Sequence, residues 1–193
     1  MRRLALILSA ALLTGTAALA DAGGVPRLGD DGLYHPAWEQ ETFKNLPDDL
    51  AEAKASGKRL LIIVEQRGCI YCKKMETEVF PDPAIDRMLT DDYFALKINM
   101  WGDTEVTDFD GKVLSEKEAV RRWGINFTPT MIFVPETVPE GKTAAQAAVI
   151  MMPGAFGKGT TRALLTYVKT DAYKDGQGFQ AYLQSQAKAE KSD

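Results

Sequence analysis

The chain has 193 residues, of which 45% are hydrophobic and 26% are charged, a composition that suits a globular domain and excludes disordered and collagen-like classes. Its 2 cysteines exclude a scaffold held by several disulfides, and its 1 histidine, His35, argues against a histidine-built metal centre or a serine–histidine triad. The formal net charge of −4 argues against a nucleic-acid partner, because phosphate contacts need a basic surface.

Residues 1–20 have the pattern of a secretory signal peptide. Arg2 and Arg3 precede an apolar run from Leu4 to Leu13, and the sequence Ala18-Leu19-Ala20 provides a cleavage site. The apolar run is shorter than the ~20 residues that cross a membrane, and no later run is long enough. We therefore expect an exported, periplasmic protein that is not membrane-embedded. An oxidising compartment allows a lasting disulfide.

Residues 21–46 form the next segment, which is rich in glycine, proline and aspartate. This composition predicts an irregular N-terminal leader that wraps on the domain formed by residues 47–193. His35 lies in the leader before a proline, and as a lone loop histidine it is expected to be a surface residue rather than a ligand.

The remaining sequence predicts alternating helices and strands. A continuous apolar run at 60–64 is typical of a strand buried on both faces. Asp110-Gly111 predicts a two-residue hairpin turn, and Ser115 with Glu118 forms a capping box that starts a helix. The expected elements are helices at 48–58, 73–80, 84–89, 115–123, 159–169 and 179–188, strands at 60–64, 93–100, 131–134 and 145–152, and a hairpin at 106–114.

Cys69 and Cys72 form a CxxC motif between the first buried strand and a helix. At a helix N-terminus, free backbone N–H groups and the helix dipole stabilise a thiolate and so lower the pKa of the Cys69 thiol. Cys72, one turn along, can then attack a mixed disulfide formed on Cys69. Lys73 and Lys74 either add to this effect or are exposed helix positions. Two other interpretations stay open, a structural disulfide and half of a soft-metal site.

Thr128-Pro129 precedes the third core strand. A proline that opens an interior strand cannot donate a hydrogen bond, and a cis Thr128–Pro129 peptide beside the cysteines would avoid this problem while presenting the Thr128 backbone to a docking peptide. The alternative is a trans proline at a sheet edge.

The element order, the CxxC position and the Thr-Pro sequence together resemble the thioredoxin superfamily over residues 47–170. The stretch from Cys69 to Met75, the 101–111 insertion and Phe127-Thr128-Pro129-Thr130 resemble the exported SoxW-type thioredoxins. The resemblance implies an α/β thioredoxin fold with a central mixed sheet flanked by helices, an inserted hairpin and an extra C-terminal helix. The first half of the sheet is expected to be parallel and the second half antiparallel.

The resemblance also implies roles for single residues. Cys69 would be the exposed nucleophile, Cys72 the resolving thiol, Pro129 the cis-proline and Gly154 the small residue on the third side of the substrate groove. Beside these roles, the Thr128 backbone is expected to meet the substrate, and Tyr71 is expected either to contact the substrate or to shield the disulfide. The implied activity is reduction of protein disulfides without a bound cofactor or metal, with electrons supplied by a membrane thiol transporter.

The sequence departs from thioredoxin in two ways. The Trp-Cys-Gly-Pro-Cys motif is absent, and Ile63 stands where thioredoxin keeps a buried aspartate that serves proton transfer. Glu65 is two residues further along the same strand face. It could pair with Lys97, which matches a thioredoxin position, or relay a proton to Cys72; the alternative is a solvated glutamate at the strand end.

Two alternative functions remain open from the sequence. A disulfide oxidant or isomerase would use the same residues as a reductase. A soft-metal, copper-binding protein would use the two cysteines and a methionine, although methionines more often fill gaps in cores. The methionines in question are Met100, Met131, Met151 and Met152.

Overall fold

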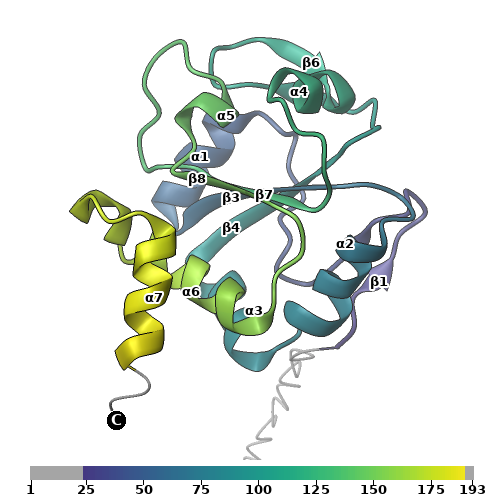
Figure 1. Ribbon diagram of the computed structural model, residues 1–193. Coiled ribbons are helices and arrows are strands. Elements are labelled where there is room, and N and C mark those ends of the chain that lie inside the picture. Colours follow the sequence, from purple (N-terminus) through teal and green to yellow (C-terminus); the bar gives the residue numbers. More distant parts are fainter. Residues whose placement is uncertain (1–23, 190–193) are drawn as a thin grey trace, which may run out of the picture.

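A four-stranded mixed sheet forms the centre of the computed structural model, which describes residues 24–189 (Figure 1). The strand order is β4-β3-β7-β8. The β3–β4 pair is parallel, whereas β7 is antiparallel to both β3 and β8. The strands are β3 (Arg59–Glu65), β4 (Tyr93–Asn99), β7 (Thr130–Phe133) and β8 (Ile150–Pro153).

Helices cover both faces of this sheet, so the predicted α/β architecture is confirmed. In Figure 1, α1, α4 and α5 lie above the sheet, and α2, α3 and α6 lie below it. The helices are α1 (Leu46–Ala55), α2 (Ile70–Lys74), the π-helix η1 (Met75–Val79), α3 (Pro83–Asp92), α4 (Glu116–Arg122), α5 (Ala144–Ala147), α6 (Lys158–Lys169), the 3-10 helix η2 (Ala172–Asp175) and α7 (Phe179–Ala189).

Strand β3 contributes to both hydrophobic cores, because successive side chains of a strand point to opposite faces. Leu60, Ile62 and Val64 belong to the core beneath α1 and α4. Leu61 and Ile63 belong to the core packed against η1, α3 and α6. All seven residues of β3 are buried. The position of the loop after β3 is therefore fixed by packing on both sides of the sheet.

Two details of the predicted elements were wrong. Residues 144–147 form α5 instead of the start of a strand, because Thr143 and Gln146 form a capping box in front of an alanine-rich segment. The inserted hairpin exists, with β5 (Glu105–Thr107) antiparallel to β6 (Val113–Ser115), but its connection is longer than two residues. The Asp108 N–H donates to the Lys112 carbonyl, which closes a loop of three residues around Asp110.

The described part of the leader packs against the loop that precedes α2 and, at Glu39 and Gln40, against β4. It contains a short pair of strands, β1 (Arg27–Leu28) and β2 (Tyr34–His35), and Trp38 is buried in the core beside η1. The Gln40 N–H donates to the Ala95 carbonyl of β4. The predicted signal peptide, residues 1–20, lies outside the described residues. Within 24–189, no helix is long and apolar enough to cross a membrane.

Candidate active site around the Cys69–Cys72 disulfide

The loop that follows β3 places Cys69 at the start of a helix. The turn contains Gly68, whose φ of 73° lies in the left-handed region that favours glycine. Cys69 is the N-cap residue of α2, and the Cys72 backbone N–H donates to its Sγ over 3.0 Å. The sulfur therefore accepts one of the N–H bonds that a helix start leaves free.

Cys69 and Cys72 are joined by a disulfide. Cys69 is half-buried, whereas Cys72 is only 3% exposed. An attacking group from solvent can thus reach the first sulfur more readily than the second. This asymmetry separates the two cysteines into an outer and an inner position.

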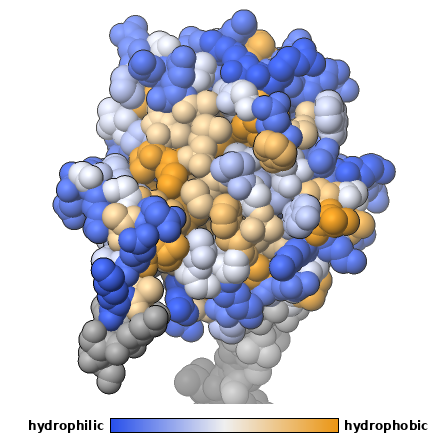
Figure 2. Space-filling view, in the orientation of Figure 1, coloured by the Kyte–Doolittle hydropathy of each residue, from blue (hydrophilic) through white to orange (hydrophobic). Residues whose placement is uncertain are grey.

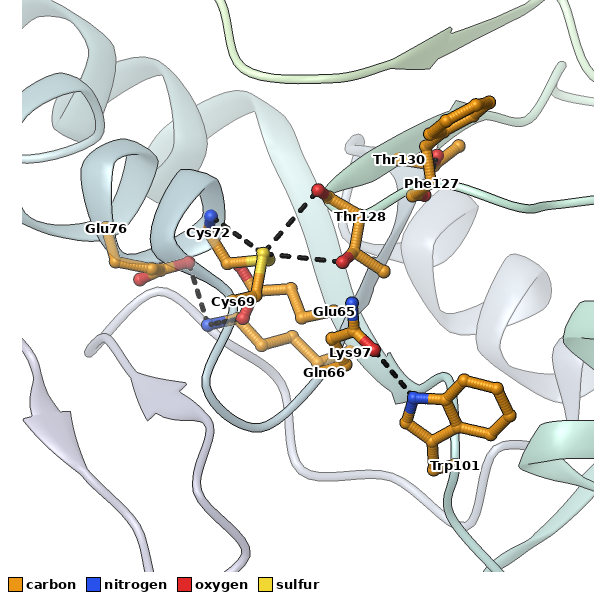
Figure 3. The surroundings of a disulfide bond; sticks show 10 residues. All are labelled: Glu65, Gln66, Cys69, Cys72, Glu76, Lys97, Trp101, Phe127, Thr128 and Thr130. Atoms are coloured by element: carbon orange, nitrogen blue, oxygen red, sulfur yellow. Dashed lines mark hydrogen bonds and ion pairs between the residues drawn. A yellow bond between two sulfur atoms is a disulfide. The ribbon is translucent and has the colours of Figure 1, made fainter.

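The peptide bond between Thr128 and Pro129 is cis, and it lies beside the outer sulfur. The Thr128 hydroxyl donates to Cys69 Sγ over 3.3 Å, and the Thr128 carbonyl oxygen lies 3.5 Å from the same atom (Figure 3). The Gly154 N–H donates to the Pro129 carbonyl over 2.7 Å, and Gly154 has a φ of 102° that favours glycine. The structure therefore brings Thr128, Pro129 and Gly154 together next to Cys69.

Exposed apolar side chains surround the disulfide. Ile70 and Tyr71, between the cysteines, are 72% and 59% exposed. Phe127 precedes Thr128, and the Trp101 indole N–H donates to the Gln66 side chain in the loop before Cys69. Figure 2 shows hydrophobic residues across the middle of the molecule in the orientation of Figure 1, with hydrophilic residues around them. Exposed aromatic groups at such a place are typical of a contact surface.

A cluster of buried charges lies on the other side of the disulfide from Thr128 (Figure 3). The Lys97 ammonium donates to Glu76 Oε1 over 2.8 Å and lies 3.4 Å from Glu65 Oε2. The Lys97, Glu65 and Glu76 side chains are at most 2% exposed. Glu65 is therefore not a solvated glutamate at the strand end, and it pairs with Lys97.

The cluster shifts the pKa values of its members. Burial raises the pKa of Glu76 to about 8, although the Lys97 ammonium acts in the opposite direction. Burial lowers the pKa of Lys97, but the charges of Glu65, Glu76 and Glu39 outweigh it and leave that pKa above its ordinary value. Glu76 therefore keeps its proton near neutral pH, while Lys97 stays charged.

The leader contributes to this cluster. The Lys97 ammonium donates to the Tyr34 carbonyl, lies 4.0 Å from Glu39 Oε2 and sits 5.7 Å from the centroid of the Trp38 ring. A pocket of about 290 Å³ opens between the leader and the loop that precedes α2. Its lining includes Leu33, Tyr34, Arg67, Glu65, Cys69 and Cys72.

Sequence reasoning missed Glu76, Trp101, Phe127 and the leader contacts with Lys97. A signal for Glu76 was available, since it is the one charged residue among the buried positions of the helix after the cysteines, Cys72, Met75, Glu76, Val79 and Phe80. A buried acid on an apolar helix face is uncommon without a partner.

The lysines that the sequence singled out follow the cysteines on the helix, Lys73 lining the same pocket as both of them, whereas the methionines lie in the cores. Lys73 and Lys74 are exposed helix residues. The four methionines are divided between the two cores, with Met100 and Met151 in one and Met131 and Met152 in the other. Within residues 24–189, no group of three or more histidine, cysteine, aspartate or glutamate side chains is arranged to hold a metal ion.

A family model described as the thioredoxin-like domain matches residues 46–169. The chain belongs to this family. The match covers every strand of the central sheet, the CxxC motif and the cis-proline, and it confirms the predicted thioredoxin superfamily. The part of the leader with Tyr34 and Glu39 precedes the matched region.

Solved structures show the same fold. The chain is 24% identical to a thioredoxin from Thermus thermophilus, with a TM-score of 0.51 over 69% of this chain and 91% of that one. A thioredoxin-fold protein from Helicobacter pylori is 16% identical, with a TM-score of 0.52 over 69% of this chain and 86% of that one. No curated protein matches the sequence.

Proposed function

We propose that the protein is a thiol–disulfide oxidoreductase that reduces disulfide bonds of other proteins. The observation that supports this most directly is the position of Cys69. Its half-buried sulfur caps a helix beside a cis-proline and is bonded to a buried partner, Cys72. A structural disulfide would gain little here, because a loop of four residues restricts the unfolded chain only slightly.

The reaction begins from the reduced form, with a thiolate on Cys69 and a thiol on Cys72. The Cys69 thiolate attacks one sulfur of the substrate disulfide, a mixed disulfide forms, and the other substrate sulfur leaves as a thiolate that takes a proton from water. Cys72 then loses its proton and attacks Cys69 Sγ. The second substrate sulfur leaves, so the substrate gains two electrons and the protein becomes the disulfide seen in the structure.

Two hydrogen-bond donors support the Cys69 thiolate in this scheme. The Cys72 backbone N–H and the Thr128 hydroxyl both point at Cys69 Sγ, at 3.0 and 3.3 Å. Hydrogen bonds to a charged acceptor stabilise it more than those to a neutral one. Both donors are held by the fold, so the thiolate needs no rearrangement of its surroundings to be stabilised.

The substrate is proposed to bind along the surface formed by Tyr71, Thr128, Pro129 and Gly154. The exposed apolar side chains of Ile70, Trp101 and Phe127 border this surface. They favour a polypeptide segment with apolar residues next to its cysteine.

The buried cluster is proposed to take the proton that Cys72 loses. Glu65, from the end of β3, and Lys97, from β4, lie on the inner side of the disulfide together with Glu76. Glu76, whose pKa burial raises to about 8, can accept and release a proton near neutral pH. It would serve, held by Lys97, in place of the aspartate that Ile63 replaces.

The place of action is proposed to be the periplasm, after removal of residues 1–20. The basic, apolar and small-residue pattern of that segment supports export. An exported reductase needs a source of electrons, and a membrane thiol transporter of the kind that the SoxW-type resemblance implies would supply them. The disulfide itself is the redox group, and no bound cofactor is proposed.

An insulin-reduction assay tests the proposal. Wild-type protein, kept reduced by dithiothreitol, should accelerate precipitation of the insulin B chain, and Cys69→Ser and Cys72→Ser should each lose this activity. Glu78→Gln, an exposed position on the same helix, provides the control and should keep wild-type activity. Activity in either single serine variant would contradict the two-cysteine mechanism.

The direction of electron flow is tested separately. Equilibration of the protein with a glutathione buffer should leave the pair reduced only under strongly reducing ratios if the protein is a reductase. Oxidation of a substrate, or a potential in the range of known disulfide oxidants, would favour the oxidant or isomerase alternative. Titration of the reduced protein with cuprous ion addresses the soft-metal alternative.

A further inference from the structure

The buried lysine next to the disulfide is held as much by the leader as by the thioredoxin-like domain. Lys97 contacts the Tyr34 carbonyl, Glu39 and the Trp38 ring, all of which precede the matched region. From the domain itself it contacts Glu65 and Glu76. The leader therefore closes the cluster on one side.

The leader also connects the cluster to the surface. His35 Nδ1 lies 2.9 Å from Glu39 Oε2, and the other ring nitrogen lies 3.1 Å from Asp31 Oδ1. The His35 side chain is 41% exposed, whereas the Glu39 side chain is 10% exposed. Titratable groups thus follow one another from solvent to the inner side of the disulfide, in the order His35, Glu39, Lys97 and then the two buried glutamates.

His35 and Glu76, at the two ends of this series, both have pKa values above their ordinary ones. Partial burial lowers the pKa of His35, but hydrogen bonds and charges from Asp31 and Glu39 outweigh it and raise that pKa above its ordinary value. Burial raises the pKa of Glu76 to about 8. Near neutral pH the cluster therefore holds a proton, and it must release that proton before it can accept the one from Cys72.

We propose that His35 is the solvent-facing end of a proton route that runs through Glu39 and Lys97 to Glu76 and Glu65. The inference rests on the proposed function. Glu76 gives a proton to Lys97 as Lys97 gives one to Glu39, Glu39 passes it to His35, and His35 releases it to water. The Glu76 carboxylate, which has now lost its proton, takes the proton of the Cys72 thiol. The resulting Cys72 thiolate attacks the mixed disulfide. His35 is a positioning residue in this scheme, since it touches neither sulfur.

A competing route is built into the same region. The pocket between the leader and the loop before α2 is lined by Glu65 and both cysteines, so water in it could exchange protons with the cluster directly. The two routes differ in one respect. Only the first depends on the imidazole of His35 and on the carboxylate of Glu39.

The experiment follows the reduced protein reacting with an aromatic disulfide whose leaving thiol is coloured. Stopped-flow absorbance separates the attack of Cys69, which releases the first coloured thiol, from the attack of Cys72, which releases the second. His35→Gln keeps a hydrogen-bond donor but removes titration, and His35→Ala leaves space for added imidazole. Glu41→Gln, an exposed leader position, provides the control.

At neutral pH we expect the rate of the second phase to fall about tenfold in both His35 variants. This is less than the ~10²–10⁴-fold rate loss typical of a group that transfers the proton to or from the reacting atom itself. Added imidazole should restore the rate of His35→Ala, and the difference from wild type should disappear above the Glu76 pKa of about 8. Glu39→Gln should slow the same phase without rescue. The first phase and the Glu41→Gln rates should match wild type.

Two results would overturn the route. If the second phase has the wild-type rate in the His35 variants, protons exchange through the pocket instead. If the second phase is slower but imidazole does not restore its rate, His35 has a structural role. The coloured disulfide reacts with the two thiols whether or not the protein reduces protein disulfides. Either result would therefore reject the proton route without rejecting the proposed function. That function fails instead if wild-type protein reacts with this reagent but reduces no protein disulfide.

Discussion

Replacing the buried Glu76 by glutamine should change how the stability of the oxidised protein depends on pH. The Glu76 side chain is fully buried, and its pKa is about 8, against an ordinary value of 4.5. Between these two values the folded state binds a proton that the unfolded state has lost. The free energy of unfolding therefore falls as pH rises through this window, by roughly 1 kcal/mol for each pH unit.

The Glu76→Gln variant lacks this proton and should lose that part of the slope. At the acidic end of the window it should match wild type, because glutamine can still accept the hydrogen bond from Lys97. At the upper end it should be more stable than wild type by a few kcal/mol. Urea unfolding of the disulfide-bonded protein at a series of pH values measures this difference.

The comparison cancels the contributions of buried acids for which no interaction with Glu76 is found, because these acids are present in both proteins. Asp49, whose pKa burial raises to about 6, and Glu39 contribute equally to the two curves. Glu78→Gln, on the same helix but exposed, should reproduce the wild-type slope. Parallel curves for wild type and Glu76→Gln would refute the account of a proton held at this carboxyl.

Three further changes test other parts of the structure. Gly102→Ala should destabilise the protein by about 1–3 kcal/mol in urea, because its Cβ would overlap the buried Glu116 carboxylate, and an unchanged midpoint would contradict that contact. Asp108→Ala should cost about 2–5 kcal/mol, since this buried carboxylate accepts hydrogen bonds from two backbone N–H groups and a buried indole, and a loss near zero would mean that water replaces it. Thr128→Val should slow alkylation of reduced Cys69 by iodoacetamide at mildly acidic pH about tenfold, because the thiolate loses one donor, and an equal rate would show that the hydroxyl does not support it.

The sequence predicted those features that depend on local patterns. The apolar run at 60–64 and the helix-starting position of Cys69 identify the strand, the turn and the CxxC site without further information. The segment at 144–147 shows the limit of such patterns. Its alanines fit a strand or a helix, and the capping pair of Thr143 and Gln146 decides in favour of the helix.

Features that depend on contacts between distant segments could not be predicted. In the sequence, Glu76 resembles an ordinary exposed helix glutamate. Its role depends on the contact with Lys97, which lies 21 residues further along the chain. The same holds for Trp101, whose indole reaches Gln66 only because β3 and β4 end side by side. His35 had no assigned partner, since its link to Lys97 runs through Glu39 and through the parallel packing of the leader on β4.

The contribution of the leader has a practical consequence for anyone who trims this protein to its family boundaries. A version that begins at residue 46 would keep both cysteines, every strand of the central sheet and the cis-proline, and would look complete by homology. It would nevertheless open Lys97 to water and remove one wall of the pocket. Redox measurements on such a shortened protein would therefore report on a cluster of Lys97, Glu65 and Glu76 whose surroundings differ from those in the full chain.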